Sequence, residues 1–156
     1  MTIGNGMADI DLAAIKTLDG LDVSGKRVLV RADLNVPVEA GAVADATRIE
    51  RVLPTINALR KRGARVILMS HFGRPKGERS PETSLKPVAV KLKELLGAGV
   101  LFLDDCVGPD VEAGIAAMKD GDVALLENLR YHAHETKNDI GFAKQLAALG
   151  DIYVDD

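Results

Sequence analysis

The feature that most constrains the fold of this chain is a repeated order of elements, in which a short apolar run leads into a polar loop and then into an amphipathic helix. Apolar runs rich in β-branched residues are typical of strands, whereas apolar residues three and four positions apart form one face of a helix. We expect strands at 28–32, 64–69, 100–103, 123–126 and 152–154, and helices at 47–62, 84–96, 109–119 and 138–149.

Strands that alternate with helices build βαβ units, in which the strands run parallel and the helices cover the sheet. The sequence therefore predicts an α/β fold, a three-layer α/β/α arrangement around a parallel, Rossmann-like sheet. The fifth predicted strand reaches almost to the last residue, Asp156. We expect the sheet to be truncated in or just after that strand.

Local signals mark the ends of the helices. Thr47 fits the start of a capping box with the glutamate three positions on, and Ser84 fits the cap of the second helix. Asn138 or Asp139 fits the cap of the last helix. Pro54 lies inside the first helix and predicts a kink, because proline lacks the N–H that a helix interior needs.

Composition narrows the class of protein. The 156 residues are 47% hydrophobic, which suits one domain with its own core, and the net charge of −3 argues against nucleic acid or an anionic membrane as partner. Cys106, the single cysteine, is expected to be a small buried hydrophobe, and a chain without an intrachain disulfide suits a reducing compartment. We expect a cytoplasmic protein.

Met7 is a candidate second start, which would make residues 1–6 an extension.

Polar residues gather where the predicted strands end. Parallel strands place their carboxyl ends at one edge of the sheet, where ligands bind in open α/β folds. Arginine binds phosphate and carboxylate through a bidentate fork, and a helix N-terminus adds positive potential. We therefore expect an anion site for a small ligand with more than one negative charge. Its candidate residues are Asp33 and Asn35 after the first strand, Arg48 at the start of the first helix, His71 and Arg74 after the second strand, and Arg130 after the fourth.

Other motifs are weaker signals of function. Residues 20–27 nearly spell a P-loop, but they precede a strand and lack the final Ser or Thr, so we expect a turn. His132 and His134 alternate as metal ligands can, yet no third ligand follows at a recognisable spacing, so we expect surface histidines. Asp104 and Asp105 are expected to cap the loop that follows them. We therefore expect no metal site in this chain.

Six segments resemble the amino-terminal half of the phosphoglycerate kinase family, in the order in which the family has them. They are RADLNVP (31–37), DATRIE (45–50), SHFGRP (70–75), SLKPVA (84–89), LLENLRYH (125–132) and KNDIGFAKQLAALGDIYVDD (137–156). The resemblance covers nearly the whole chain from about Lys16. This chain departs from the family at Ala32, Leu34, Phe72 and Asp155, where Val, Phe, Leu and Asn are usual, and none of these changes removes a side chain expected to act at the site.

The resemblance implies an activity and a domain organisation. Members of the family are glycolytic two-domain kinases that pass a phosphoryl group between 1,3-bisphosphoglycerate and ADP on one side and 3-phosphoglycerate and ATP on the other. Residues 1–156 would form the amino-terminal domain, which binds 3-phosphoglycerate. The carboxy-terminal domain, which binds Mg-ATP or Mg-ADP, would be absent, and no cofactor is expected in this chain.

The resemblance also implies how the full-length enzyme and this fragment behave. The full-length enzyme would be a monomer without nucleic-acid or membrane partners. We expect the fragment to bind 3-phosphoglycerate weakly at most and to be inactive alone. Loss of a later strand would leave an edge of the sheet open to pairing or aggregation.

Residue roles follow by matching motifs. Asp33 and Asn35 would contact the glycerate end of the substrate. Arg48 would be the catalytic residue beside the transferring group, which fits because phosphoryl transfer to a carboxylate needs charge stabilisation more than a base. The other substrate-binding residues would be Leu34, Phe72 and Gly73, through backbone if at all, and His71, Arg74 and Arg130, which form a basic patch around the phosphate.

Two alternatives from other classes stay open. A magnesium-dependent phosphatase with an aspartyl nucleophile would attack through Asp33 and hold the metal with Asp155 and Asp156, but it wants a second carboxylate where this chain has Asn35. A non-enzymatic anion-binding or receiver-like domain is the other alternative. A receiver domain requires paired acidic residues after its first strand, whereas in this chain the pair follows the third predicted strand.

Overall fold

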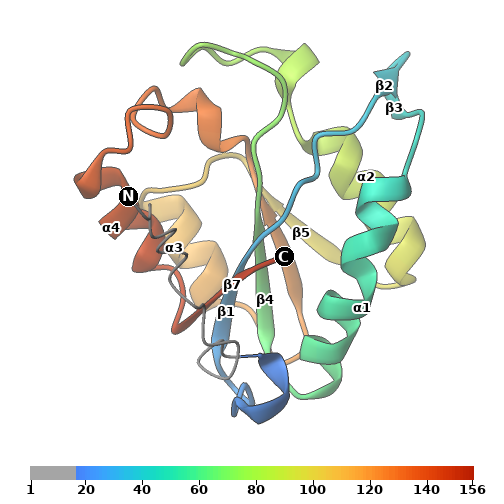
Figure 1. Ribbon diagram of the computed structural model, residues 1–156, viewed down its shortest axis with the longest axis vertical. Helices are drawn as coiled ribbons and strands as arrows, with labels where there is room; N and C mark the ends of the chain where they lie inside the picture. The colour runs from blue at the N-terminus through green and yellow to red at the C-terminus, as the bar shows by residue number, and fades with distance from the viewer. Residues whose placement is uncertain (1–16) are drawn as a thin grey trace, which may run out of the picture.

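The computed structural model describes residues 17–156, which form a five-stranded parallel sheet with helices on both faces (Figure 1). Each pair of neighbouring strands is parallel, which confirms the predicted α/β fold. The proposed second start at Met7 and the extension before it lie outside the described residues. The strands, in spatial order, are β5 (Val100–Leu103), β6 (Val123–Leu126), β4 (Arg65–Met69), β1 (Arg27–Arg31) and β7 (Ile152–Asp155).

The helices form the two outer layers. In Figure 1, α1 and α2 cover one face of the sheet, and α3 and α4 cover the other. Their bounds are α1 (Thr47–Lys61), α2 (Lys86–Leu96), α3 (Pro109–Ala116) and α4 (Ile140–Ala147). In the described part of the chain, three short 3₁₀ helices lie in the loops, η2 (Leu18–Gly20), η3 (Pro81–Thr83) and η4 (Leu129–Tyr131). A two-stranded antiparallel ribbon, β2 (Val38–Glu39) with β3 (Ala42–Val43), precedes α1. Within residues 17–156, no helix combines the length and the apolar character that a bilayer span requires.

Alternate residues of the inner strands β1, β4 and β6 enter two separate cores. The register sets Val28 beside Val66, and both are fully buried against residues of α1 and α2. Their successors, Leu29 and Ile67, point to the other face and pack with residues of α3 and α4. Burial of such a side chain stabilises the fold by about 1.5–3 kcal/mol. A central strand buried on both faces explains why the apolar runs in the sequence are continuous.

The start of α1 differs from the prediction. Thr47 is the first helical residue instead of the cap, and the Asp45 carboxylate accepts its backbone N–H at 2.9 Å and its hydroxyl at 2.6 Å. The capping box at Thr47 is therefore wrong, because Asp45, two residues earlier, supplies the acceptor. Pro54 lies inside the helix, as the sequence shows.

The other helix ends agree more closely with the sequence. Asp139 caps α4 by accepting the N–H of Phe142 at 2.8 Å, as predicted. Ser84 precedes the observed cap of α2 by one residue, yet its hydroxyl still accepts the N–H of Lys86 at 3.1 Å. Helix α3 ends at residue 116 rather than 119, because the Asp122 carboxylate accepts the N–H of residue 119 at 2.8 Å and holds a turn there.

Candidate functional site

The loops that follow β1 and β4 are joined at the carboxyl edge of the sheet. Asn35 Oδ1 accepts the N–H of Gly73 at 3.2 Å, and Ser70 Oγ accepts the N–H of Leu34 at 3.0 Å. Gly73 has a φ of 58°, and a Cβ at this position would lie 3.2 Å from the methyl group of Thr83. Glycine is the residue that meets both conditions without strain. The two loops therefore form one connected surface.

Helix α1 brings Arg48 to this surface. Its Nη1 donates to the carbonyl oxygen of Asn35 at 2.8 Å and lies 3.1 Å from Asp33 Oδ2. The side chains of Arg48 and Asp33 are 51% and 56% exposed, so water screens their ion pair and it contributes little to stability. Its effect is to hold the guanidinium at the edge of the sheet. The structure thus brings together three residues that the sequence analysis predicted as neighbours.

A buried asparagine fixes the loop after β4 to the end of β6. Asn128 is 1% exposed, and its Oδ1 accepts the N–H groups of Phe72 at 3.1 Å and Arg130 at 3.0 Å. Its Nδ2 donates to the carbonyl oxygens of Phe72 at 2.6 Å and Thr83 at 2.8 Å. Both acceptor positions and both donors of the amide are therefore used. Asn128 fixes the positions of the His71–Arg74 loop and of Arg130 relative to each other.

Arg130 meets an acid that the sequence analysis did not identify. Glu135 Oε2 lies 3.3 Å from Arg130 Nε, and Glu135 Oε1 lies 3.2 Å from Nη2 of Arg31 at the end of β1. The Glu135 side chain is 12% exposed, so water screens these pairs only in part. This internal carboxylate neutralises part of the arginine charge, and an incoming anion must compete with it for both arginines.

His71 lies among these charges. Partial burial lowers the pKa of His71, and the positive charges of Arg130 and Arg31 lower it as well. The negative charges of Asp33 and Glu135 act in the opposite direction but do not cancel the shift. His71 is therefore mostly neutral at pH 7, since the usual pKa of histidine is about 6.5. A bound anion would favour its protonated form.

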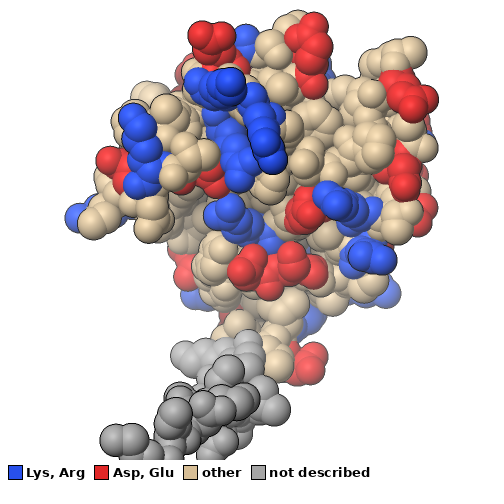
Figure 2. Space-filling view, turned by 45° about the horizontal axis from the view of Figure 1, so that its top comes forward, with Lys and Arg blue, Asp and Glu red and all other residues tan. Residues whose placement is uncertain are grey.

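Arg74 and Arg130 line one hollow of about 550 Å³ at this edge. Figure 2 shows basic side chains gathered at the middle of this side of the molecule, with acidic side chains around them. Among the ion pairs within residues 17–156, none involves Arg74, whose guanidinium is exposed. The rest of the hollow is lined by Pro75, Lys76, Gly77, Ala133 and Thr136.

The three remaining predicted residues support the loops. The side chains of Leu34 and Phe72 are buried in the core, at 0% and 6% exposure. The N–H groups of Leu34, Phe72 and Gly73 all donate to side chains of the protein. Leu34 and Phe72 thus have no side chain to offer a ligand.

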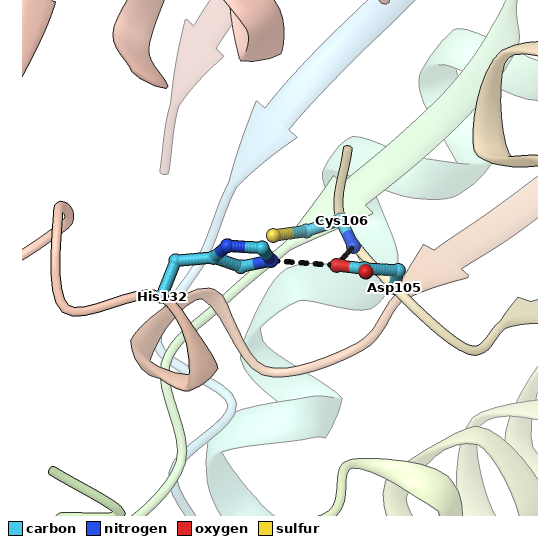
Figure 3. Close-up of side chains that lie close together, drawn as sticks. All are labelled: Asp105, Cys106 and His132. Atoms are coloured by element: carbon cyan, nitrogen blue, oxygen red, sulfur yellow. Dashed lines mark hydrogen bonds and ion pairs between the residues drawn. The ribbon is translucent and has the colours of Figure 1, made fainter. Parts of the chain in front are cut away.

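A second group of polar side chains meets where β5 and β6 end (Figure 3). His132 Nε2 lies 2.7 Å from Asp105 Oδ1, and the same oxygen accepts the N–H of Cys106 at 2.7 Å. His132 is therefore not the free surface histidine that the sequence suggested, whereas His134 is exposed as expected. Sequence spacing does not reveal this cluster, because its members follow two different strands.

Each member of the cluster has a distinct environment. Burial alone would raise the pKa of Asp105, but hydrogen bonds from His132 and from the Cys106 N–H outweigh it, and the pKa is lowered. Burial, with the charge of Asp105, raises the pKa of the Cys106 thiol to about 12. The thiol is therefore protonated at neutral pH and is a poor nucleophile.

Residues 20–27 are not arranged as a nucleotide phosphate site. Residues 20–27, the segment that resembles a P-loop, contain a turn at Ser24–Gly25 and lead into β1, as expected. A P-loop instead follows a strand and presents the N-terminus of a helix to the phosphates.

Comparison with known proteins places this chain in a family. The phosphoglycerate kinase family matches residues 18–156. The phosphoglycerate kinase of Granulibacter bethesdensis is 58% identical over 143 residues, which are 92% of this chain and 36% of that protein. That of Moorella thermoacetica is 61% identical over 140 residues, 90% of this chain and 36% of that protein.

Solved structures of the same family align with this chain. Phosphoglycerate kinase from Coxiella burnetii aligns with a TM-score of 0.78 and 37% identity, over 89% of this chain and 34% of that one. The enzyme from Pyrococcus horikoshii aligns with a TM-score of 0.81 and 33% identity, over 91% of this chain and 36% of that one. The chain thus spans about a third of the length of the relatives it matches. It belongs to the phosphoglycerate kinase family.

Proposed function

We propose that this chain is the 3-phosphoglycerate-binding domain of a phosphoglycerate kinase. The whole enzyme would transfer a phosphoryl group from 1,3-bisphosphoglycerate to ADP, which gives 3-phosphoglycerate and ATP, and would catalyse the reverse reaction. The observation that carries the proposal is the meeting of two groups at one sheet edge, Arg48 with Asp33 and Asn35, and Arg74 with Arg130. Mg-ATP or Mg-ADP would bind to the part of the relatives' length that this chain does not span.

The two groups suit the two ends of the substrate. The hollow lined by Arg74 and Arg130 takes the phosphate, because guanidinium groups bind phosphate oxygens through paired N–H donors. Asp33 and Asn35 take the hydroxyl and carboxylate end. Arg48, beside them, stabilises the charge on the moving phosphoryl oxygens. The acceptor carboxylate is already ionised, so no general base is needed. We place the enzyme in the cytoplasm as a monomer.

Calorimetric titration of 3-phosphoglycerate into the 156-residue protein tests the binding site. Replacement of Arg130 or Arg74 by alanine should weaken binding about 10–150-fold, since a hydrogen bond to a charged group is worth about 1.5–3 kcal/mol. Arg51→Ala is a matched control, because Arg51 is exposed on α1 one turn after Arg48. Binding that is no tighter than that of sulfate, or that is equally weakened by Arg51→Ala, would contradict the assignment.

A coupled assay of ATP consumption tests the second part of the proposal. With 3-phosphoglycerate and Mg-ATP, the 156-residue protein should show no turnover, because the nucleotide would bind elsewhere. Measurable turnover by the purified protein would contradict this. Magnesium-dependent hydrolysis of a generic phosphate ester, abolished by Asp33→Asn, would instead favour the aspartyl phosphatase. In that case binding should show no preference for 3-phosphoglycerate.

A further inference from the structure

The cluster of Asp105, Cys106 and His132 has the composition of a metal site. One ligand atom of each, a carboxylate oxygen, a thiol sulfur and an imidazole nitrogen, lies within 4.8 Å of the other two. Figure 3 shows the sulfur and the ring turned toward the same side of the carboxylate. These three ligand types are the ones that bind Zn²⁺ in proteins. Tetrahedral zinc with bonds of 2.0–2.3 Å needs ligand atoms about 3.3–3.8 Å apart. His132 Nε2 and Asp105 Oδ1 lie 2.7 Å apart, so a rotation of either side chain must open this pair by about 0.6 Å when the ion binds.

The surrounding side chains hold each ligand in place. Arg79 Nη2 lies 2.9 Å from Asp105 Oδ2, so the other oxygen, Oδ1, faces His132. The His132 ring stacks on Phe142 with centroids 5.2 Å apart. Carboxylates and imidazoles that bind metals are usually fixed by neighbours in this way.

The cluster is also accessible on one side. A hollow of about 570 Å³ lies beside Asp105 and is lined by two further acids, Asp104 and Asp110. The side chains of Asp105 and His132 are 36% and 27% exposed, whereas Cys106 is fully buried. A cation that entered from the hollow would meet the Asp105 carboxylate first, because neither His132 nor Cys106 lines the hollow. The hollow has room for a water molecule as fourth ligand.

We propose that Asp105, Cys106 and His132 bind one borderline-soft divalent transition metal, with Zn²⁺ as the fitting ion. The metal displaces the proton between His132 Nε2 and Asp105 Oδ1, and Cys106 binds as the thiolate. Binding of Zn²⁺ therefore releases the thiol proton to solvent. The Nε2 proton of a neutral His132 ring moves to Nδ1, and a charged ring releases one proton to solvent, so the imidazole binds in its neutral form. The thiolate and the carboxylate carry two negative charges, which balance the charge of the ion. Oxygen-preferring Mg²⁺ does not suit a sulfur ligand.

This site is independent of the proposed 3-phosphoglycerate site. None of its three ligands lines the hollow of Arg74 and Arg130. The test therefore uses metal alone, and its outcome does not depend on the substrate.

Titration of Co²⁺ into the 156-residue protein, freed of metal with a chelator and then dialysed, tests the proposal. Co²⁺ replaces Zn²⁺ in such sites, and a cobalt–thiolate bond gives charge-transfer absorption in the near ultraviolet. Since Cys106 is the single cysteine of the chain, this absorption reports on one site. We expect it to saturate at one equivalent of Co²⁺ and to disappear when Zn²⁺ is added.

Four variants separate the site from adventitious binding. Cys106→Ser should remove the charge-transfer absorption, and Asp105→Asn and His132→Gln should each weaken Co²⁺ binding at least tenfold. His134→Gln, a matched change at an exposed histidine two residues away, should leave binding unchanged. Circular dichroism establishes that each variant is folded. As a second measurement, Zn²⁺ should raise the thermal unfolding midpoint of the wild type and not that of His132→Gln. A folded wild type without the absorption, or an equal effect of His134→Gln, would overturn the proposal.

Discussion

Replacement of Asn128 by alanine tests how strongly one buried amide holds the site together. The change removes four hydrogen bonds, to the N–H groups of Phe72 and Arg130 and the carbonyl oxygens of Phe72 and Thr83. A hydrogen bond contributes about 0.5–1.5 kcal/mol, so we expect a loss of about 2–6 kcal/mol. The bonds to Arg130 and Thr83 are only part-buried, and water can replace them in part. We therefore expect about 3–4 kcal/mol.

Urea unfolding followed by circular dichroism measures this loss. With an m-value of about 2 kcal/mol/M, the midpoint should fall by about 1.5–2 M. Asn57→Ala is a matched control, because Asn57 lies within α1 at a half-buried position and alanine favours the helix. Its midpoint should stay within about 0.25 M of the wild type. A loss below about 1 kcal/mol at Asn128, with the m-value unchanged, would refute the assignment of these four bonds.

Three further predictions concern the site itself. Glu135→Gln should tighten the binding of phosphate and 3-phosphoglycerate in calorimetry, because it frees Arg31 and Arg130 from a competing carboxylate; weaker binding would mean that Glu135 mainly orients the arginines. Gly73→Ala should cost about 1–2 kcal/mol in urea unfolding and should weaken 3-phosphoglycerate binding, because the residue has a positive φ and the added Cβ would lie 3.2 Å from the methyl group of Thr83; unchanged binding would contradict the role of the loop. The pKa of His71 is lowered, so the unfolded chain takes up a proton first as the pH falls. Stability should therefore decrease below about pH 6.5, and His71→Gln should reduce this decrease; equal pH profiles of the two proteins would contradict it.

Much of the fold follows from the sequence because burial and periodicity are local properties. The continuous apolar run of β4 shows that this strand is buried on both faces, and residues such as Asp139 mark a helix end within a few positions. The order of the strands does not follow, since the sequence does not show that β7 pairs with β1 rather than with β6. The small ribbon of β2 and β3 was not predicted, because two residues per strand leave no periodicity to detect.

In the candidate site, too, some features could be predicted from the sequence and others could not. Strand ends predict that Asp33, His71 and Arg130 share one edge, because all strands of the sheet are parallel. Contacts between side chains cannot be predicted from strand ends, since they depend on the conformations of the loops at this edge of the sheet. Glu135 meets its two arginines from a loop after η4, and no spacing in the sequence marks it. The cluster at Cys106 was missed for the same reason, because each member was judged by its neighbours in sequence.

The position of β1 in the sheet has a consequence for synthesis on the ribosome. Its neighbour β4 is made soon after it, but β7 follows much later, with Arg27 and its partner Asp151 separated by 124 residues. At about 5–20 residues per second, translation needs roughly 6–25 s to cover that distance. During this time one edge of β1 in the nascent chain, from Val28 to Arg31, has no partner strand. A chaperone that holds the emerging chain would have its greatest effect in this interval, before Ile152 reaches its place beside Val28.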